Sequence, residues 1–429
     1  MNYIFDYIMI PMQIIIFLFT IYYFTIAFFG FYKRNEKKIT EPKSNFAVII
    51  AAHNEENVIG QLLDNLKMLK YPKELYDVYV IADNCTDKTA QIARDNNAIV
   101  CERFNSTQKG KGYAMEWMFA KLFKMQKKYD GVVVFDADNL VHPNFLMEMN
   151  NRLCKGEKII QGYLDSKNPD DTWISGTFSI SFWVVNHIWH LAKYNIGLSS
   201  VLGGTGMCIS YDVLKRYGWG ATCLTEDMEF TMKALLSGIK TTWAHDAIVY
   251  DEKPLTFMQS WKQRKRWAQG HFDIAGRYIP SLIREGIKQR KLFILDGVIH
   301  LLQPYFLIFS AAFIVLNYVQ YFVPFYTNIL YMFIPIRVFQ IIAVGQYIFP
   351  MIVLYKTRAS LKSWLYLILY PLFIYSWIPI TFAGFLDRHQ KEWVHTAHTR
   401  GLSYSDLIVE SSGDFGKDEL LMKRIAKAK

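Results

Sequence analysis

Three aspartates follow apolar runs of the sequence at positions where carboxylates can act as ligands. Asp83 follows the run DVYVIA, and Asp136 and Asp138 follow the run GVVVF as Asp-Ala-Asp. Two carboxylates in an Asp-x-Asp turn can point into one crevice and hold Mg²⁺ or Mn²⁺ against a diphosphate. Aspartate is also common in solvated turns, which is the competing interpretation of a lone Asp-x-Asp. Asp83 at an equivalent position after a neighbouring run favours a site.

A second acidic motif, Thr225-Glu226-Asp227, precedes a helical run from Met228 to Ser237. A carboxylate at this position can act as a general base towards a sugar hydroxyl. Thr225 or Asp227 can equally cap the helix that follows. The motif alone leaves catalysis and capping open.

A third motif concentrates three cations and an indole in Gln263-Arg264-Lys265-Arg266-Trp267. The planar guanidinium of arginine suits a pyrophosphate leaving group, and tryptophan offers a flat face to a sugar ring. The alternative is a basic band that contacts anionic lipid headgroups.

Two glycine-containing turns complete the set. Lys109-Gly110-Lys111-Gly112 is flexible and basic but lacks the spacing of a P-loop, so it either approaches a phosphate or forms a solvated loop. Gly203-Gly204-Thr205-Gly206 either lets the backbone approach a ligand closely or forms only a tight turn.

The strands and helices that must position these residues can be recognised from the periodicity of apolar residues in the sequence. Continuous apolar runs predict buried strands, amphipathic repeats predict helices, and NCTDKT from Asn84 to Thr89 predicts a loop. This order predicts a doubly wound parallel sheet whose ligand lies beyond the carboxyl ends of the strands. The predicted strands are Phe46–Ala52, Asp77–Ala82 and Gly131–Phe135, and the predicted helices are Asn57–Leu69 and Ala90–Asn96.

The composition predicts a membrane protein with a soluble-type domain. Of the 429 residues, 52% are hydrophobic and 16% aromatic, too many for an ordinary soluble enzyme. A formal charge of +10 alongside membrane segments indicates an anionic bilayer or a phosphate-bearing substrate, and no nucleic acid. The five cysteines are scattered and form no Cys-x-x-Cys pair, so they predict neither a zinc site nor a disulfide framework.

The first apolar block, 8–31, predicts one uncleaved spanning helix. The basic residues behind it (Lys33, Arg34, Lys37 and Lys38) place the domain that follows, 45–271, in the cytoplasm. Residues 272–298 mix apolar and basic side chains, which is typical of amphipathic helices lying in the membrane interface.

The second apolar block, 300–386, predicts about three spans, near 300–322, 332–355 and 363–386. Parity then places the polar tail, 387–429, outside. The basic residues at the start of that tail (Arg388, Lys391 and Arg400) favour the cytoplasm instead, so the sequence leaves its side open.

From Phe46 to about His271 the ordered motifs resemble the family 2 glycosyltransferases with a GT-A fold. Within that family they are most similar to membrane-embedded polysaccharide synthases, such as those of cellulose, chitin, hyaluronan and poly-N-acetylglucosamine. The resemblance implies a Rossmann-like α/β domain with a mixed sheet, flanked by transmembrane helices. It implies these roles: nucleotide binding by Glu55, Asp83, Lys111 and Asp136; metal binding by Asp136 and Asp138; general base catalysis by Asp227; and diphosphate or acceptor contacts by Thr225, Glu226, Gln263, Arg266 and Trp267. The family often has Tyr or Arg where this chain has His53.

The same resemblance implies an inverting, metal-dependent transfer from a UDP-sugar to a growing β-linked polysaccharide, coupled to translocation across the plasma membrane. One alternative is the transfer of a single sugar to a lipid carrier or glycolipid, and a more distant one is a catalytically dead transporter or scaffold. Residues 392–396 (EWVHT) are similar to a gating element, which would require a cytoplasmic tail. The sugar, the linkage and the oligomeric state cannot be read from the sequence.

Overall fold

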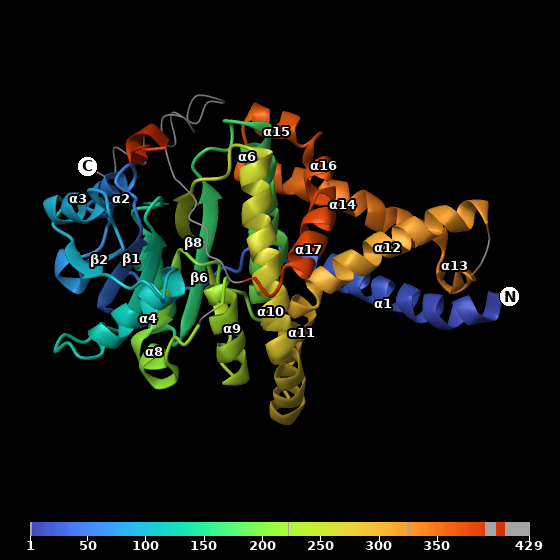
Figure 1. Ribbon diagram of the computed structural model, residues 1–429, viewed down its shortest axis with the longest axis horizontal. Coiled ribbons are helices and arrows are strands. Elements are labelled where there is room, and N and C mark those ends of the chain that lie inside the picture. Colours follow the sequence, from blue (N-terminus) through green and yellow to red (C-terminus); the bar gives the residue numbers. More distant parts are fainter. Residues whose placement is uncertain (1, 222, 324–325, 391–399, 408–429) are drawn as a thin grey trace.

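The computed structural model describes residues 2–221, 223–323, 326–390 and 400–407. An α/β domain forms one end of the molecule, and three apolar helices project from the other end (Figure 1). The polar segment 392–396, expected to resemble a gate, lies outside the described residues.

The domain is built on one mixed sheet, which in the described part of the chain has eight strands in the order β3-β2-β1-β4-β7-β6-β8-β5. β3, β2, β1 and β4 run parallel to one another, whereas β7 is antiparallel to both of its neighbours, β4 and β6. The strands are β1 (Phe46–Ala52), β2 (Tyr76–Asp83), β3 (Ile99–Arg103), β4 (Gly131–Asp136), β5 (Leu140–Val141), β6 (Ile159–Ser166), β7 (Met207–Ser210) and β8 (Thr241–Asp251).

The parallel half of the sheet confirms the three predicted strands, and the other half shows why the sheet as a whole is mixed. β7 runs against β4 with Met207 opposite Val134, so the start of β7 lies at the edge where β4 ends. The turn 203–206, which leads into β7, is therefore brought to the same edge as Asp136. A wholly parallel sheet, as the apolar runs alone predict, would have placed that turn at the opposite edge.

Helices cover both faces of the sheet, which explains why β1 is apolar throughout. Phe46, Val48 and Ile50 pack with α2 and α5, while Ala47 and Ile49 pack with α4, α8 and α9 on the other face. The helices of the domain are α2 (Ile59–Leu66), α3 (Thr89–Asp95), α4 (Lys111–Leu122), α5 (Phe145–Cys154), α6 (Trp173–Val185), α7 (Ala192–Asn195), α8 (Tyr211–Tyr217) and α9 (Glu226–Leu236), with a 3₁₀ turn at Lys73–Leu75 and a π-helical segment at Asn186–Leu191.

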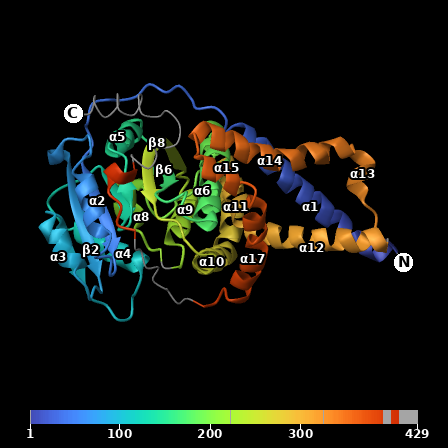
Figure 2. The same ribbon diagram turned by 90° about the horizontal axis from the view of Figure 1, so that it is seen from above.

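Three helices in the described part of the chain are long and apolar enough to cross a membrane: α1 (Asn2–Phe28), α12 (Gln303–Phe322) and α14 (Ile336–Thr357), with the short α13 (Ile329–Phe333) between the last two. Figure 2 shows α1 crossing between α12 and α14. Phe19 of α1 stacks on Phe306 of α12 at 5.0 Å between ring centroids, and Phe24 lies 5.4 Å from Phe349 of α14.

The remaining apolar segments differ from the expected spans. The expected span 363–386 is divided into α15 (Leu361–Tyr366), α16 (Tyr370–Tyr375) and α17 (Trp377–Leu386), each too short to cross a bilayer. The expected boundary between 271 and 272 falls inside one 33-residue helix, α10 (Phe257–Gln289), which is followed by α11 (Leu292–Leu301). In Figure 1, α10 runs across the direction of α12 and α14, as a helix lying along a membrane surface would.

The described start of the tail returns to the α/β domain. Gln269 of α10 donates a hydrogen bond to the carbonyl oxygen of Asp387 (3.0 Å), and Arg400 pairs with Asp171. Tyr404 and Leu407 pack against Leu140 of β5. The parity count, which sent the tail to the other side of the membrane, fails because 363–386 does not form a straight span.

A buried ion pair joins α7 of the α/β domain to α11. The side chains of Lys193 and Asp296 are 1% and 3% exposed, and their N···O distance is 2.7 Å. Tyr22 of α1 donates a further hydrogen bond to the Asp296 carboxylate. Three elements that are distant in the sequence are therefore held together by one carboxylate.

We expect Lys193→Met to destabilise the protein by about 3–5 kcal/mol, because it leaves the buried Asp296 carboxylate without its cation. The measurement is thermal unfolding of the purified protein in detergent. Lys67→Met is the control, since that lysine is 47% exposed where it pairs with Asp64, and a surface pair contributes little. Equal unfolding temperatures for the two variants would contradict the role of the buried pair.

Candidate active site

The predicted acidic residues gather at the edge where the parallel strands end. Asp136 ends β4 opposite Ala51 of β1, and Asp83 ends β2 one position beyond the pair Ala52–Ala82. The structure therefore brings Asp83 and Asp136 to one edge, as expected for parallel strands.

Asp83 is held by a partner that the sequence reasoning missed. Arg103, the last residue of β3, donates a 2.6 Å hydrogen bond to Oδ1 of Asp83, and both side chains are almost fully buried. Arg103 also donates to the carbonyl oxygen of Gln108 (2.7 Å), and a ring nitrogen of His53 lies 2.7 Å from the carbonyl oxygen of Asp83. β3 is short and carries charges, so no apolar run revealed it.

Glu55 lies in the turn after β1. Its side chain is buried, its backbone N–H donates to the hydroxyl of Thr89 (2.8 Å), and its carbonyl oxygen accepts from the first turn of α2. The backbone of Glu55 therefore ties the end of β1 to the start of α3.

Lys111 links the two glycine-containing turns. It begins α4 directly after Gly110, whose φ of +104° suits glycine. Its ammonium donates to Oδ1 of Asp136 (2.5 Å) and to the carbonyl oxygen of Gly204 (2.6 Å). Burial lowers the pKa of Lys111, but the charges of Asp136 and Glu226 outweigh that effect and raise it. Lys111 is therefore a fixed cation at the strand ends and not part of a solvated loop.

Asp138 follows in the turn after β4 and is buried. Its carboxylate accepts hydrogen bonds from the backbone N–H of Glu252 (3.1 Å) and from the side-chain amide of Asn139 (3.2 Å). Asp251 and Lys253, 2.5 Å apart at the end of β8, lie close enough to interact with it electrostatically. These two residues were not predicted, because β8 contains polar residues and so has no continuous apolar run by which a strand could be recognised.

Asp136 and Asp138 offer the donor chemistry of a Mg²⁺ or Mn²⁺ site. The described residues contain no group of three His, Cys, Asp or Glu side chains that could hold a metal ion. Mg²⁺ is usually held by one or two carboxylates together with substrate phosphates. The pair therefore fits a divalent cation that is completed by a diphosphate.

Asp227 lies close to the Gly203–Gly206 turn, in the first turn of α9. A Cβ atom on Gly204, whose φ is +81°, would lie 3.3 Å from Oδ2 of Asp227 and 3.9 Å from the Lys111 ammonium. Burial and then the charge of Glu226 raise the pKa of Asp227 to about 7, and burial also raises the pKa of Glu226. A carboxyl group with a pKa near 7 suits a general base at neutral pH.

Thr225 connects this motif to α10. Its side chain offers no capping bond to α9, which removes the simple capping interpretation for this residue. A Cβ atom on Gly270 would lie 2.3 Å from the Thr225 hydroxyl oxygen, so α10 approaches the start of α9 as closely as the absence of a side chain allows. Next to it, buried Glu229 accepts a 2.6 Å hydrogen bond from Arg277 of α10.

The three cations of the motif 263–267 on α10 have different partners. Arg264 is fully buried, donates to the Ser376 hydroxyl (2.9 Å) and lies over the ring of Phe373. Lys265 pairs with Asp387 at the end of α17. Arg266 interacts electrostatically with Glu226. A basic band facing lipid would not have these contacts, so Arg264 and Lys265 are structural anchors, and Arg266 is the cation of this motif that lies close enough to Glu226 to interact with its carboxylate.

Trp267 and Gln263 lie on the same helix as Arg266. Trp267 is partly buried and stacks on Trp377 of α17 with 6.4 Å between ring centroids, while Phe178 of α6 meets its ring edge to face at 5.9 Å. The side-chain oxygen of Gln263 is buried and has no hydrogen-bond partner in the described structure. Gln263 therefore has acceptor capacity that the described residues leave unused.

Comparisons with known proteins identify relatives of the chain. The family model described as glycosyltransferase like family 2 matches residues 42–270. A protein of Bacillus subtilis named as a probable glycosyltransferase is 25% identical over 299 residues, covering 66% of this chain and 69% of the relative. A β-monoglucosyldiacylglycerol synthase of Nostoc is 26% identical, with 63% and 58% covered. A poly-β-1,6-N-acetyl-D-glucosamine synthase of Staphylococcus aureus is 24% identical, with 60% and 62% covered.

The fold has a solved counterpart. A mannosyltransferase from Pyrobaculum calidifontis, in complex with GDP-mannose and Mn²⁺, superposes with a TM-score of 0.59, covering 90% of this chain and 99% of that one. The two sequences are 17% identical, so this likeness establishes the common fold alone. The alignments with the Nostoc and Staphylococcus enzymes cover less than two thirds of those proteins.

Proposed function

The chain belongs to the glycosyltransferase like family 2, and from this membership we propose that it transfers a sugar, with inversion, from a UDP-sugar to a membrane-associated acceptor. One observation carries the proposal: Lys111, Asp136 and Asp227 converge on Gly204 at the edge where the strands end. Lys111, a cation that can bind a phosphate, and Asp227, a carboxylate with a raised pKa, thus both lie next to the Gly203–Gly206 turn.

In the proposed reaction, Asp227 takes the proton of the acceptor hydroxyl while that oxygen bonds to the anomeric carbon of the sugar. The bond between that carbon and the UDP oxygen breaks, and its electron pair leaves with UDP. Lys111 and Arg266 stabilise the negative charge of the leaving diphosphate. Asp136 and Asp138 would hold a Mg²⁺ or Mn²⁺ ion, which neutralises diphosphate charge when bound. Glu55 and Asp83 lie on the nucleotide side.

The first candidate acceptor is the end of a growing β-linked polysaccharide. It is supported by Gln263, Arg266 and Trp267, which lie on one helix between the acidic motif and the apolar end of the molecule. Stacking on an indole holds a sugar without demanding one orientation of its hydroxyls, which suits an acceptor that must slide after each addition.

The second candidate acceptor is a single lipid molecule. It is supported by the helices: the described residues contain three candidate spans, and none of the most apolar stretch of α12 is buried. An aqueous path for a polysaccharide needs helices that enclose it, whereas a lipid acceptor needs only access from the bilayer to the face of α10. In both cases the proposal places the α/β domain on the cytoplasmic side, as the basic residues after α1 predict.

We expect the size of the product to distinguish the two acceptors, and the Trp267→Ala variant to test the role of the indole. For a polysaccharide acceptor, the variant should shorten or abolish polymer while hydrolysis of the donor persists, and Arg266→Ala should depress both. For a lipid acceptor, the wild type itself should add a single sugar. Sizing of radiolabelled products made from a panel of UDP-sugars measures this outcome. The matched control is Trp261→Ala on the same helix, where the indole packs on Phe257; equal effects of both tryptophan variants would reject the acceptor role of Trp267.

A further inference from the structure

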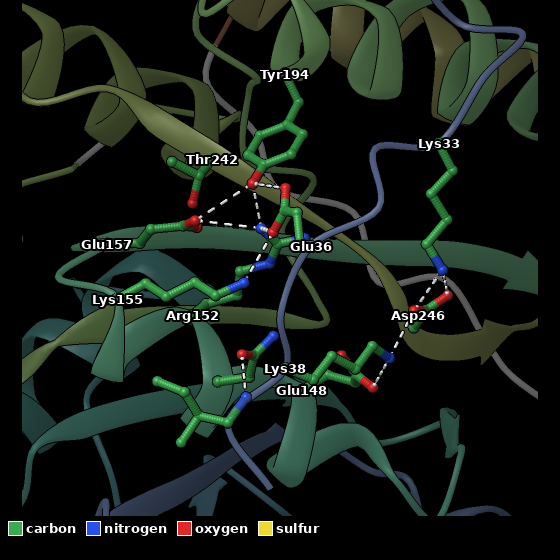
Figure 3. Close-up of polar contacts among 12 residues, drawn as sticks. Lys33, Glu36, Lys38, Glu148, Arg152, Lys155, Glu157, Tyr194, Thr242 and Asp246 are labelled. Atoms are coloured by element: carbon green, nitrogen blue, oxygen red, sulfur yellow. Dashed lines mark hydrogen bonds and ion pairs between the residues drawn. The ribbon is translucent and has the colours of Figure 1, made fainter.

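A cavity of about 320 Å³ lies between the segment that follows α1 and the underside of the α/β domain. Residues 33–38 form one wall, and side chains of α5, α7 and β8 form the others. Figure 3 shows this segment crossing the domain, with Lys33 and Lys38 reaching Asp246 and with Glu36 reaching Tyr194.

This cavity is separate from the candidate active site. It is bordered by Trp243, His245 and Asp246 in the first half of β8, whereas Asp251, near the candidate site, lies at the end of that strand. No residue that lines it belongs to the acidic motifs or to α10. Ligands of the two sites therefore do not compete for side chains.

The cavity lies at the depth of phospholipid headgroups if α1 and α14 span the bilayer. Its wall begins five residues after the end of α1 at Phe28, and Lys356 at the end of α14 donates a hydrogen bond to the carbonyl oxygen of Phe31. The ends of two spanning helices thus meet at the mouth of the cavity. Charged side chains directly beyond a span occupy the headgroup layer.

Both signs of charge line the cavity within reach of one another. Four cations (Lys33, Arg34, Lys38 and Arg152) face three carboxylates (Glu36, Glu148 and Asp246). Asp246 is shared by Lys33 (2.5 Å) and Lys38 (2.9 Å), and these two lysines are 49% and 46% exposed. Their charges hold the pKa of Asp246 at about 2 despite its partial burial, so this carboxylate stays ionised.

We propose that this cavity binds the headgroup of an aminophospholipid, with the phosphate on Lys33 and Arg34 and the ammonium on Asp246 and Glu148. A dipolar headgroup that enters between Lys33 and Asp246 exchanges one ion pair for two and leaves every charge paired. A purely anionic headgroup that takes Lys33 would leave Asp246 and Glu148 to share Lys38 as their one cation among the ion pairs described, which is the costlier arrangement in a partly buried site. The partly buried ring of Tyr194, which also lines the cavity, supplies an apolar face for the glycerol.

The test uses the full-length protein, purified in detergent and stripped of lipid. Dioleoyl phosphatidylethanolamine, phosphatidylglycerol and phosphatidylcholine are added separately, and bound lipid is counted by native mass spectrometry. We expect phosphatidylethanolamine to bind at least tenfold more tightly than the other two, since phosphatidylglycerol lacks the ammonium and phosphatidylcholine lacks its N–H donors. Asp246→Asn should shift the preference towards phosphatidylglycerol, and Lys33→Gln should weaken the binding of phosphatidylethanolamine and phosphatidylglycerol alike.

Lys43→Gln is the matched control, because Lys43 follows in the same segment, is 61% exposed and pairs only with Glu41 among the ion pairs described. Its lipid binding should equal that of the wild type, and unchanged donor hydrolysis in all three variants shows that they are folded. Equal retention of the three lipids, or an Asp246→Asn variant that keeps the wild-type preference, would overturn the proposal. Soluble O-phosphoethanolamine should compete only at far higher concentration; competition at equal concentration would reject a membrane lipid as the source.

Discussion

Asp227→Asn should lower turnover by about 10²-fold or more while the affinity for UDP stays near that of the wild type. The amide keeps the shape of the side chain and can still accept the 2.8 Å hydrogen bond from the backbone of Met228, but it cannot take a proton. The loss therefore falls on the transition state and not on nucleotide binding. The measurements are steady-state transfer from the UDP-sugar and calorimetric titration with UDP. Asp212→Asn, an exposed aspartate on α8, is the control.

The pH dependence of the wild type gives a second measure of the same group. Because burial and Glu226 raise the pKa of Asp227 to about 7, the base is protonated, and so inactive, below that pH. The value of kcat/KM should rise about tenfold per pH unit on the acidic side and level off above about pH 7. A parallel loss of UDP binding in Asp227→Asn, or a flat profile between pH 5 and 7, would make Asp227 a structural residue.

Asp138→Asn should reduce transfer to background and weaken nucleotide binding, and excess EDTA should do the same to the wild type. In the proposed reaction a divalent cation held by Asp138 binds the diphosphate, and an amide is a much poorer ligand for Mg²⁺ than a carboxylate. The measurements are transfer and UDP affinity with and without Mn²⁺. The variant should remain folded, since the amide oxygen can still accept from the backbone of Glu252.

Asp64→Asn, an exposed aspartate of α2 whose carboxylate pairs with Lys67, is the matched control and should retain full transfer. Full activity of the wild type in excess EDTA would show that Lys111 and Arg266 carry the diphosphate without a metal ion. Rescue of Asp138→Asn by raised Mn²⁺ would agree with a weakened ligand set.

The sequence predicted the strands that are buried on both faces and little of the sheet beyond them. β1, β2 and β4 are continuous apolar runs because helices cover both of their faces. β6 and β8 carry polar residues that the fold uses internally: Gln161 of β6, for example, donates 2.9 Å to the carbonyl oxygen of Thr205 and accepts 2.8 Å from the N–H of Gly203. Such a residue weakens the pattern of a strand while fixing the turn beside the site.

The candidate site was predicted as a set of motifs, and the structure adds the connections between them. That Lys111 bridges Asp136 and Gly204 could not be read from spacing, because these residues come from three separate parts of the chain. Arg103 was missed because β3, an edge strand, has no continuous apolar run from which it could be predicted. The roles of Arg264 and Lys265 could not be separated from that of Arg266, since direction around a helix axis decides which of three adjacent cations faces the protein interior.

The contacts of α10 also determine which segments a truncated form of this protein must contain. The helix touches Thr225 through Gly270, and Arg264 on the same helix is fastened to α16 through Ser376. A fragment that stops near residue 271 would therefore cut through the middle of α10 and remove Arg277, which donates a hydrogen bond to buried Glu229 of α9. A truncation that is meant to be active has to retain α10 in full, together with the segments around Ser376 and Asp387 that hold Arg264 and Lys265. Exchange of catalytic parts with a relative would likewise have to carry these segments along.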